Sequence, residues 1–486
     1  MTQTRLQNIK SIALIRAGFM SRHKNAHPLH CAAPISLKCT QAFLLETGVA
    51  RVSILDCMIK MKTMIEIEEA IKTEQVDLVV LDVASATYEH GIALCDIIKK
   101  NPLAIIIGVG SDVSERAPYY QMLDKYFDVL IRGEYEQEVC SFVRNYNKGQ
   151  TLTALRNFYN QIKIKDTHKL EDLRTLPVLK WSLDELLQYP YRYPLNLYQR
   201  IIAGYVFTSR GCAHACSFCS PSVRKTFGNR LRLQRAEHVV NEMDQLKKIG
   251  VNFVSFEDDD FTGSQAHVKA ICAELIRGDI QISWCCHARI DEVDLELLLL
   301  MRQSGCVFIL FGVESGSKSI VEKLNKSPQG LDWNEQARRT FLNARQAGIA
   351  TCALFIVGSP EETMDDVNSS IRLALRLKPD IIKVHNFTLY PGSRDYRKYQ
   401  KKSSSFSSQH HYLQPLFNVS AMSDHELRRA QIIFYRRIFF RPGYIVRHLW
   451  DYLIFYILNW DWSFNMLNEV LMFLLFSNKK KYHEKL

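Results

Sequence analysis

Short apolar runs rich in β-branched residues alternate with helix-like segments over residues 11–147. The apolar runs read SIALIRA, RVSILDC, DLVVLDV, AIIIGVG and FDVLIRG. The segments between them, 34–48, 63–74 and 88–100, carry apolar residues at helical spacing, and a further helical segment follows the last run. Strands that alternate with helices predict a doubly wound parallel sheet of the Rossmann or flavodoxin type over residues 1–150.

Small and hydroxylated residues stand where two of these strands end. Doubly wound sheets bind ligands beyond the carboxyl ends of their strands. The candidate ligand-binding residues at those ends are Ser85, Thr87, Gly108 and Gly110. They would let a large ligand approach the backbone, although glycine and serine also simply form tight turns.

A second series of alternating strands and helices occupies residues 201–400, after a proline- and aromatic-containing connector over 151–200. Its strands read YVFTSRG, VNFVSFEDD, ISWCCHAR, CVFILFGVE, ATCALFIVG and DIIKVHNFTL. Six strands with intervening helices predict a partial (β/α)6 TIM-like barrel, whose chemistry lies at the carboxyl ends of the strands. The polar insert KKSSSFSSQHH then separates the barrel from a helical C-terminal region over 412–486.

Composition narrows the class of protein. The chain has 486 residues, of which 47% are hydrophobic, so it is too apolar for a disordered scaffold. Its 13 cysteines lie in a chain without a signal-peptide pattern, which favours the reducing cytoplasm. The net charge of +11 comes without a long basic run, so we expect no nucleic-acid partner. Polar residues interrupt the apolar stretch 449–476, so we expect no transmembrane helix.

Three cysteines follow the first barrel strand in a C-x3-C-x2-C loop, at Cys212, Cys216 and Cys219. A zinc ion would need a fourth protein ligand, for which His214 inside the loop stays open. An iron–sulfur cluster held by three thiolates keeps one iron free to act on a substrate.

This loop, with Phe218 before the last cysteine, resembles the signature of the radical S-adenosylmethionine (SAM) superfamily. The resemblance continues through FEDDDFT, Trp284…Arg289, GVESGS, FIVGSPEET and LYPGS, and covers nearly all of residues 170–400. It implies that the three cysteines hold a [4Fe-4S] cluster and that SAM chelates the fourth iron.

The resemblance also implies a set of SAM-binding residues at the strand ends. Arg289 suits the cofactor carboxylate because its planar fork matches that group. Asp259 and Asp260 are weaker candidates than the two acids before them, and Gly312 and Gly316 either approach the cofactor or close turns. The expected SAM-binding residues are Phe218, Glu257, Asp258, Arg289, Glu314, Ser315 and Gly358.

A doubly wound domain before such a barrel resembles the cobalamin-binding class of the superfamily, and the strand ending in Gly133-Glu134 strengthens the match. The D-x-H-x-x-G motif that supplies an axial histidine to cobalt is missing after the first strand, which weakens the cobalamin prediction. A group of His23, His27, His30 and Cys31 lies there instead, and loop histidines of this kind are usually solvated.

The resemblance implies reductive SAM cleavage to a 5′-deoxyadenosyl radical, with methyl transfer to an unactivated centre of a small-molecule or lipid-like substrate as the leading reaction. Radical cyclisation or oxidation without methylation is the main alternative. A non-catalytic cobalamin- or redox-sensing protein is an alternative of another class, and an RNA methylthiotransferase is a weaker one because a second cysteine triad is missing. We expect a flavodoxin or ferredoxin as electron donor.

The tail segment FYRRIFFRPGYIVRHLWDYLIFYILNWDW interleaves arginines with aromatic and aliphatic residues. This pattern fits a surface that contacts a membrane peripherally, a lid over the barrel, or helices packed on the barrel.

Overall fold

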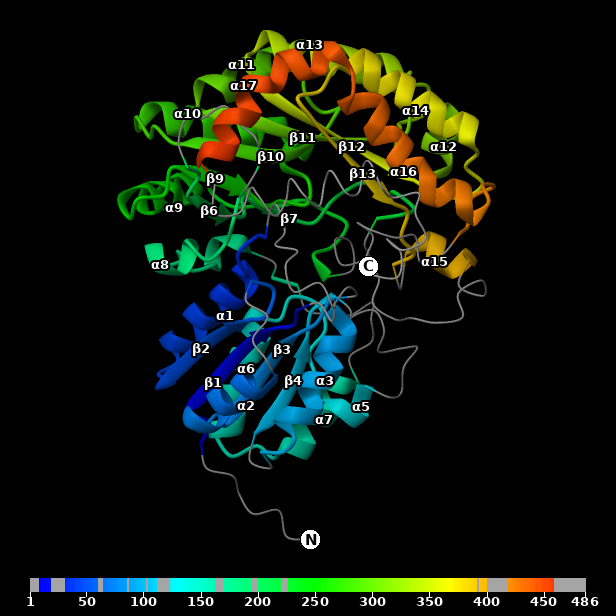
Figure 1. Cartoon of the computed structure of the whole chain (residues 1–486). Coiled ribbons are helices and arrows are strands. Elements are labelled where there is room, and N and C mark those ends of the chain that lie inside the picture. Colours follow the sequence, from blue (N-terminus) through cyan, green and yellow to red (C-terminus); the bar gives the residue numbers. More distant parts are fainter. Residues whose placement is uncertain are drawn as a thin grey trace.

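The computed structural model describes residues 8–18, 31–59, 64–84, 87–101, 104–111, 123–161, 169–170, 172–191, 193, 200–219, 226–390, 393–399 and 418–458. Within them the chain forms two larger parallel sheets, each covered by helices. Figure 1 shows the N-terminal sheet below and the second sheet above it. The predicted α/β class with parallel-sheet domains is confirmed.

The first sheet has the strand order β2-β1-β3-β4-β5, and all its strands are parallel. Each strand falls inside one of the apolar runs of the sequence. Their bounds are β1 (Ser11–Arg16), β2 (Arg51–Asp56), β3 (Leu78–Asp82), β4 (Ile105–Val109) and β5 (Val129–Leu130). In this order the chain reverses direction between β1 and β3, the place where doubly wound sheets bind ligands.

Both faces of the first sheet are buried. Along β1, Ile12 and Leu14 belong to one core cluster, whereas Ala13 and Ile15 belong to another on the opposite face. This alternation explains why the runs are apolar throughout. The helices of this region are α1 (Ile35–Glu46), α2 (Met64–Thr73), α3 (Tyr88–Ile98), α5 (Leu123–Tyr126), α6 (Glu136–Asn147) and α7 (Leu152–Asn160). Helix α7 opens the predicted connector, yet its Leu155 and Tyr159 join the first core.

The second sheet has the order β13-β12-β11-β10-β9-β6, so its strands lie side by side in chain order. Their bounds are β6 (Ala203–Val206), β9 (Phe253–Phe256), β10 (Ser283–Arg289), β11 (Cys306–Glu314), β12 (Ala350–Val357) and β13 (Ile381–Asn386). A short antiparallel pair, β7 (Ser209–Arg210) and β8 (Arg232–Leu233), stands beside it.

The intervening helices begin at well-defined caps. Asp294 and Asp332 each accept a hydrogen bond from the backbone N–H three residues later, and Thr363 forms a capping box with Asp366. The helices are α8 (Leu183–Leu186), α9 (Ala236–Lys248), α10 (Gln265–Arg277), α11 (Leu295–Gln303), α12 (Lys318–Lys323), α13 (Trp333–Gln346), α14 (Met364–Leu377) and α15 (Arg394–Tyr399). The caps leave short loops at the carboxyl ends of the strands.

Two further helices, α16 (Asp424–Phe439) and α17 (Pro442–Leu458), follow the barrel region. Gln431 of α16 donates to the carbonyl of Val384 in β13 at 2.6 Å, and Phe434 packs against Phe355 of β12. Helix α16 therefore packs on the second sheet, as one of the three expectations for the tail held. Among the described residues, we find no helix long and apolar enough to cross a membrane.

A buried ion-pair network joins the two sheets at their carboxyl ends. Arg210 is 1% exposed and lies 2.7 Å from Glu136 and 3.4 Å from Glu134, which follows β5. Glu134 also pairs with Arg232 and accepts a hydrogen bond from the backbone N–H of Leu170. The Gly133-Glu134 pair thus fastens the first domain to the loop that leads into the three-cysteine segment.

Candidate active site at the cysteine loop

The three cysteines of the loop are the accessible ones of this protein. Cys212, Cys216 and Cys219 are half-buried, whereas the other ten cysteines are buried. The charge of Cys219 affects Cys212, and that of Cys216 affects Cys219, so the three sulfur atoms are close to one another. Their exposure and proximity fit a shared metal cluster.

Burial raises the pKa of the Cys212 and Cys219 thiols, the latter to about 12. Free thiols at this site therefore keep their protons near neutral pH. A metal cluster that binds them as thiolates must displace those protons, so we expect cluster loading to depend on pH.

The backbone of the loop is held from the opposite side of the sheet. The N–H of Ser217 donates to the carbonyl of Leu324 at 2.9 Å, and the Asn325 side chain donates to the carbonyl of Ala215 at 2.8 Å. Gly211 has φ of +89°, and a Cβ there would lie 2.4 Å from the carbonyl oxygen of Arg230. The loop therefore needs glycine before its first cysteine.

Arg289 at the end of β10 reaches the cysteine loop. Its Nε and Nη2 bond to Asp291 at 3.0 and 2.9 Å, and Nη2 also donates to the carbonyl of Lys326 at 2.7 Å. Its Nη1 lies 3.8 Å from the sulfur of Cys216. Burial alone would lower the pKa of Arg289, but Asp291 raises it overall, so the guanidinium stays charged beside the cysteine.

Glu314 at the end of β11 pairs with Lys326, and both side chains are buried. Their charged atoms are 2.9 Å apart, and Glu314 has a left-handed φ of +66°. A Cβ at Gly312 would lie 2.8 Å from the Lys326 nitrogen, so this glycine makes room for the ion pair. Burial works to lower the pKa of Lys326, but the charges of Glu314 and Cys216 raise it overall.

The acids after β9 divide between two places. Glu257 accepts a hydrogen bond from Ser255, and burial raises its pKa to about 7. Asp258 accepts bonds from the side chains of Thr208 and Ser209, at 2.9 and 2.6 Å, and burial raises its pKa to about 7. Asp260, given less weight from the sequence, is the acid that contacts Cys212, at 3.5 Å.

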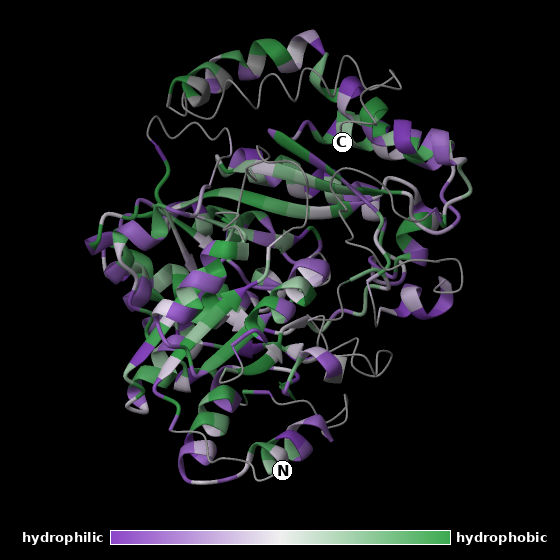
Figure 2. Ribbon diagram, turned by 60° about the horizontal axis from the view of Figure 1, so that its bottom comes forward, coloured by the Kyte–Doolittle hydropathy of each residue, from purple (hydrophilic) through white to green (hydrophobic). Residues whose placement is uncertain are grey.

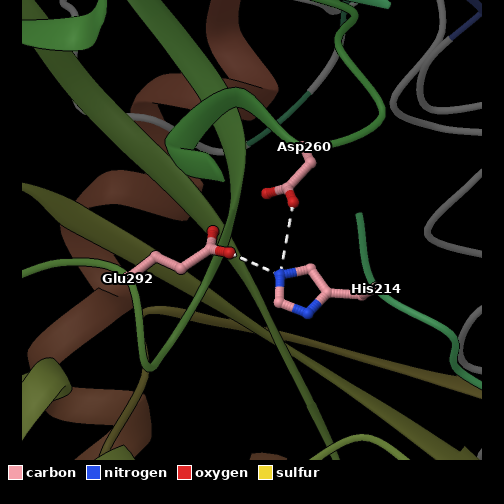
Figure 3. Close-up of side chains that lie close together, drawn as sticks. All are labelled: His214, Asp260 and Glu292. Atoms are coloured by element: carbon pink, nitrogen blue, oxygen red, sulfur yellow. Dashed lines mark hydrogen bonds and ion pairs between the residues drawn. The ribbon is translucent and has the colours of Figure 1, made fainter. Parts of the chain in front are cut away.

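His214, Asp260 and Glu292 converge beside the loop (Figure 3). The His214 Nε2 lies 2.6 Å from Glu292 and 3.5 Å from Asp260, so His214 faces two carboxylates. Burial and the charge of Glu292 raise the pKa of Asp260. Burial would also raise the pKa of Glu292, but hydrogen bonds with His214, Asp260 and Thr262 lower it to about 2.

The other SAM-binding candidates have contacts of their own. The Ser315 hydroxyl is buried and lies 3.1 Å from the hydroxyl of Ser370. Gly358 has φ of +85°, and its N–H donates to Glu362 at 2.6 Å. Phe218 packs against a separate apolar cluster that includes Leu389. No contact in the described residues joins these three directly to the cysteines, and their role toward SAM stays a prediction.

The cobalamin candidates lie in the first domain, and one falls outside the described residues. The Thr87 hydroxyl bonds to the backbone of Ala84, and a Cβ at Gly108 would meet the ring of Phe127 at 2.7 Å. Gly110 has φ of +99°, beside Asp82. Ser85 and the histidines 23, 27 and 30 lie outside the described residues. The assignment of cobalamin to these residues stays a prediction.

Sequence reasoning missed Glu292 and Lys326. Glu292 stands three residues after Arg289, and this spacing past a strand end was a signal that could have indicated it. Lys326 follows a short helix in a polar loop, where no pattern marks a buried lysine.

Comparison with known proteins places this geometry in context. Residues 206–374 match the sequence profile of the Radical SAM superfamily. An uncharacterised methyltransferase from Pyrococcus horikoshii is 26% identical over 82% of this chain and 88% of its own length. The anaerobic magnesium-protoporphyrin IX monomethyl ester cyclase of Rubrivivax gelatinosus is 28% identical over 67% of this chain and 59% of its own length.

A solved structure shares the fold. The radical S-adenosylmethionine methyltransferase TsrM from Kitasatospora setae, with cobalamin and a [4Fe-4S] cluster bound, superposes with a TM-score of 0.65. It is 16% identical, and the match covers 87% of this chain and 85% of that one.

Proposed function

We propose that this chain, a member of the radical SAM superfamily, is a cobalamin-dependent methyltransferase that binds a [4Fe-4S] cluster at Cys212, Cys216 and Cys219. One observation carries the proposal: the three accessible cysteines share a loop at the carboxyl end of the second parallel sheet, and a charged Arg289 lies beside them. The cluster and SAM would supply a 5′-deoxyadenosyl radical, and cobalamin would supply a transferable methyl group.

The residues of this chain would position the reactants. The Nη1 of Arg289, held by Asp291 and the Lys326 carbonyl, offers an N–H beside Cys216 for a cofactor carboxylate. The Glu314–Lys326 pair keeps the end of β11 in its left-handed turn at the same place. These fixed charges would orient SAM without rearranging when it binds.

We place cobalamin between the two sheets. The first sheet has the flavodoxin-like strand order, and its ligand-binding edge is the one that faces the second sheet, as the Glu134–Arg210 pair indicates. Cobalamin there would lie between the first domain and the mouth of a partial (β/α)6 barrel. Gly110 would let the ligand approach the edge of β4.

The similarity to the magnesium-protoporphyrin cyclase favours a second candidate reaction, radical cyclisation without methylation. Isotope labelling separates the two reactions. The reconstituted protein is incubated anaerobically with a cell extract, a reduced flavodoxin and SAM that carries a deuterated methyl group. Methyl transfer puts the deuterium into a product, whereas cyclisation releases 5′-deoxyadenosine without labelled product. Failure to form 5′-deoxyadenosine would leave a non-catalytic binding protein.

Helix α17 supports peripheral contact with a membrane, and hence a lipid-like substrate. Its exposed residues include Val446, Leu449, Trp450, Leu453 and Ile457, which are 46–77% exposed. At helical spacing they form one stripe, whereas the buried Tyr444 and His448 face the protein. Figure 2 shows α17 as a largely hydrophobic helix at the periphery.

The charge around this stripe suits anionic lipids. Residues 436–450 contain four arginines and no acidic residue. An apolar stripe with arginines beside it is typical of helices that lie in the headgroup region of a membrane.

A further inference from the structure

Three side chains from three separate segments converge beside the cysteine loop. His214 lies in the loop itself, Asp260 follows β9, and Glu292 follows β10. One nitrogen or oxygen atom from each lies within 4.8 Å of the others, and Figure 3 shows all three pointing into one space. Ligands bound to one metal ion at about 2.0–2.2 Å are separated by similar distances, so small rotations would suffice for shared coordination.

The hydrogen bonds of this group are incomplete. Asp260 is 4% exposed, and its Oδ1 has no hydrogen-bond partner within the described residues. Its Oδ2 accepts a bond from the Cys212 thiol at 3.5 Å. A buried carboxylate oxygen without a partner is costly, so the site calls for a positive charge or a donor.

Cluster loading makes this need larger. When Cys212 binds iron as a thiolate, it loses the hydrogen that it donates to Asp260, and two negative groups then face each other. Arg289 supplies one positive charge near Glu292, at 3.6 Å, but Asp291 already engages it at 2.9 Å. The loaded site would therefore hold two carboxylates and a thiolate with little compensation.

We propose that His214, Asp260 and Glu292 bind one divalent first-row metal ion, separate from the [4Fe-4S] cluster. One imidazole nitrogen and two carboxylate oxygens favour such ions over Mg²⁺ and Ca²⁺, which prefer oxygen ligands alone. The ion fastens the cysteine loop to the ends of β9 and β10. Three protein ligands also leave coordination positions for water.

The second shell of this site is already in place. The Thr262 hydroxyl donates to the free oxygen of Glu292 at 2.8 Å, and the Gln265 side chain donates to the Glu292 carbonyl at 2.8 Å. These bonds fix the orientation of Glu292 toward His214 and Asp260. Such outer contacts are what metal-binding carboxylates generally have.

Manganese tests the proposal on the full-length, cluster-loaded protein. The protein is titrated with Mn²⁺ anaerobically, and bound Mn²⁺ is counted by electron paramagnetic resonance. We expect one Mn²⁺ per chain, with a ¹⁴N hyperfine coupling from His214 and line broadening when the neighbouring cluster is reduced. Absence of stoichiometric Mn²⁺, or bound Mn²⁺ with neither coupling, overturns the proposal and leaves a shared proton as the occupant.

Two variants and one control complete the test. His214→Gln and Glu292→Gln should weaken Mn²⁺ binding about 100-fold or more, because each removes a direct ligand. His238→Gln alters an unrelated pair, in which His238 lies 3.7 Å from Glu242 on α9, and should leave Mn²⁺ affinity unchanged. The inference rests on the proposed function only through the ionisation of Cys212. Iron and sulfide content report on the cluster separately, so the two failures are distinguishable.

Discussion

The Nη1 of Arg289 lies 3.8 Å from the sulfur of Cys216, which brings the end of β10 against the cysteine loop. This contact explains how a side chain 73 residues away in the sequence can act at the cysteines. Asp291 and the Lys326 carbonyl occupy the other nitrogens, so one N–H is left to face the loop. The arrangement depends on the planar fork of arginine.

Arg289→Lys should therefore impair SAM binding. A lysine cannot bond to Asp291 and face Cys216 at once, so we expect the KM for SAM to rise about 10-fold or more, as for a lost charged partner. Steady-state 5′-deoxyadenosine formation measures it. Arg338→Lys is the matched control because Arg338 pairs only with Glu335 on the exposed face of α13. Equal KM values in both variants would contradict this role of Arg289.

The buried pair of Glu314 and Lys326 should contribute to stability. Glu314→Gln leaves the Lys326 ammonium buried without its carboxylate, so we expect the free energy of unfolding to fall by about 3–5 kcal/mol. Urea denaturation followed by circular dichroism measures the change. Glu322→Gln removes an exposed partner of Lys318, 4.0 Å away, and should cost about 1 kcal/mol or less. A loss at Glu314 no larger than at Glu322 would argue against the buried pair.

Glu362 gives stability a pH dependence. Burial raises its pKa to about 8, above the usual value of 4.5. A carboxyl group with a raised folded pKa binds protons more tightly in the native state, so its contribution is full below about pH 4.5 and is lost as pH rises through about 8. Glu362→Gln should flatten the fall in Tm between those values, measured by calorimetry.

The neighbouring Glu361 provides the control for that measurement. It is exposed and pairs with Lys323 at 3.0 Å, so Glu361→Gln should keep the wild-type dependence of Tm on pH. An unchanged slope in Glu362→Gln would show that Glu362 does not titrate as its burial indicates.

Membrane contact through α17 can be measured with vesicles. Val446→Glu and Leu453→Glu place charges in the exposed apolar stripe, so we expect co-sedimentation with vesicles containing phosphatidylserine to fall about 10-fold or more. Leu342→Glu, at a residue 41% exposed on α13, should bind like the wild type. If the wild type ignores both anionic and neutral vesicles, another occupant, such as a second copy or residues 459–486, covers the stripe.

Much of the fold could be predicted from the sequence because its strands are buried on both faces. The runs DLVVLDV and AIIIGVG contain β3 and β4, since a central strand with two covered faces must be apolar throughout. Helix α12 was missed because it has only six residues and no long apolar pattern. Helix α7 shows why boundaries are harder: it follows the first domain in sequence but packs into its core.

The site was predictable where chemistry is local and less so where it depends on tertiary contacts. The cysteine spacing alone indicated Cys212, Cys216 and Cys219. Among four consecutive acids, however, the sequence cannot tell which side chain faces Cys212, because that depends on how β9 ends against the loop. Asp258 instead fastens Thr208 and Ser209, and Asp260 reaches the cysteine.

One measurement tests the central claim most directly. The full-length protein is reconstituted anaerobically with iron, sulfide and hydroxocobalamin, and assayed with dithionite and SAM alongside Cys216→Ala and the buried-cysteine control Cys352→Ala. The account predicts bound cobalamin in all three proteins and 5′-deoxyadenosine in the wild type and Cys352→Ala only. Formation of 5′-deoxyadenosine by Cys216→Ala at the wild-type rate, or none by the wild type, would contradict a radical SAM site at the cysteine loop.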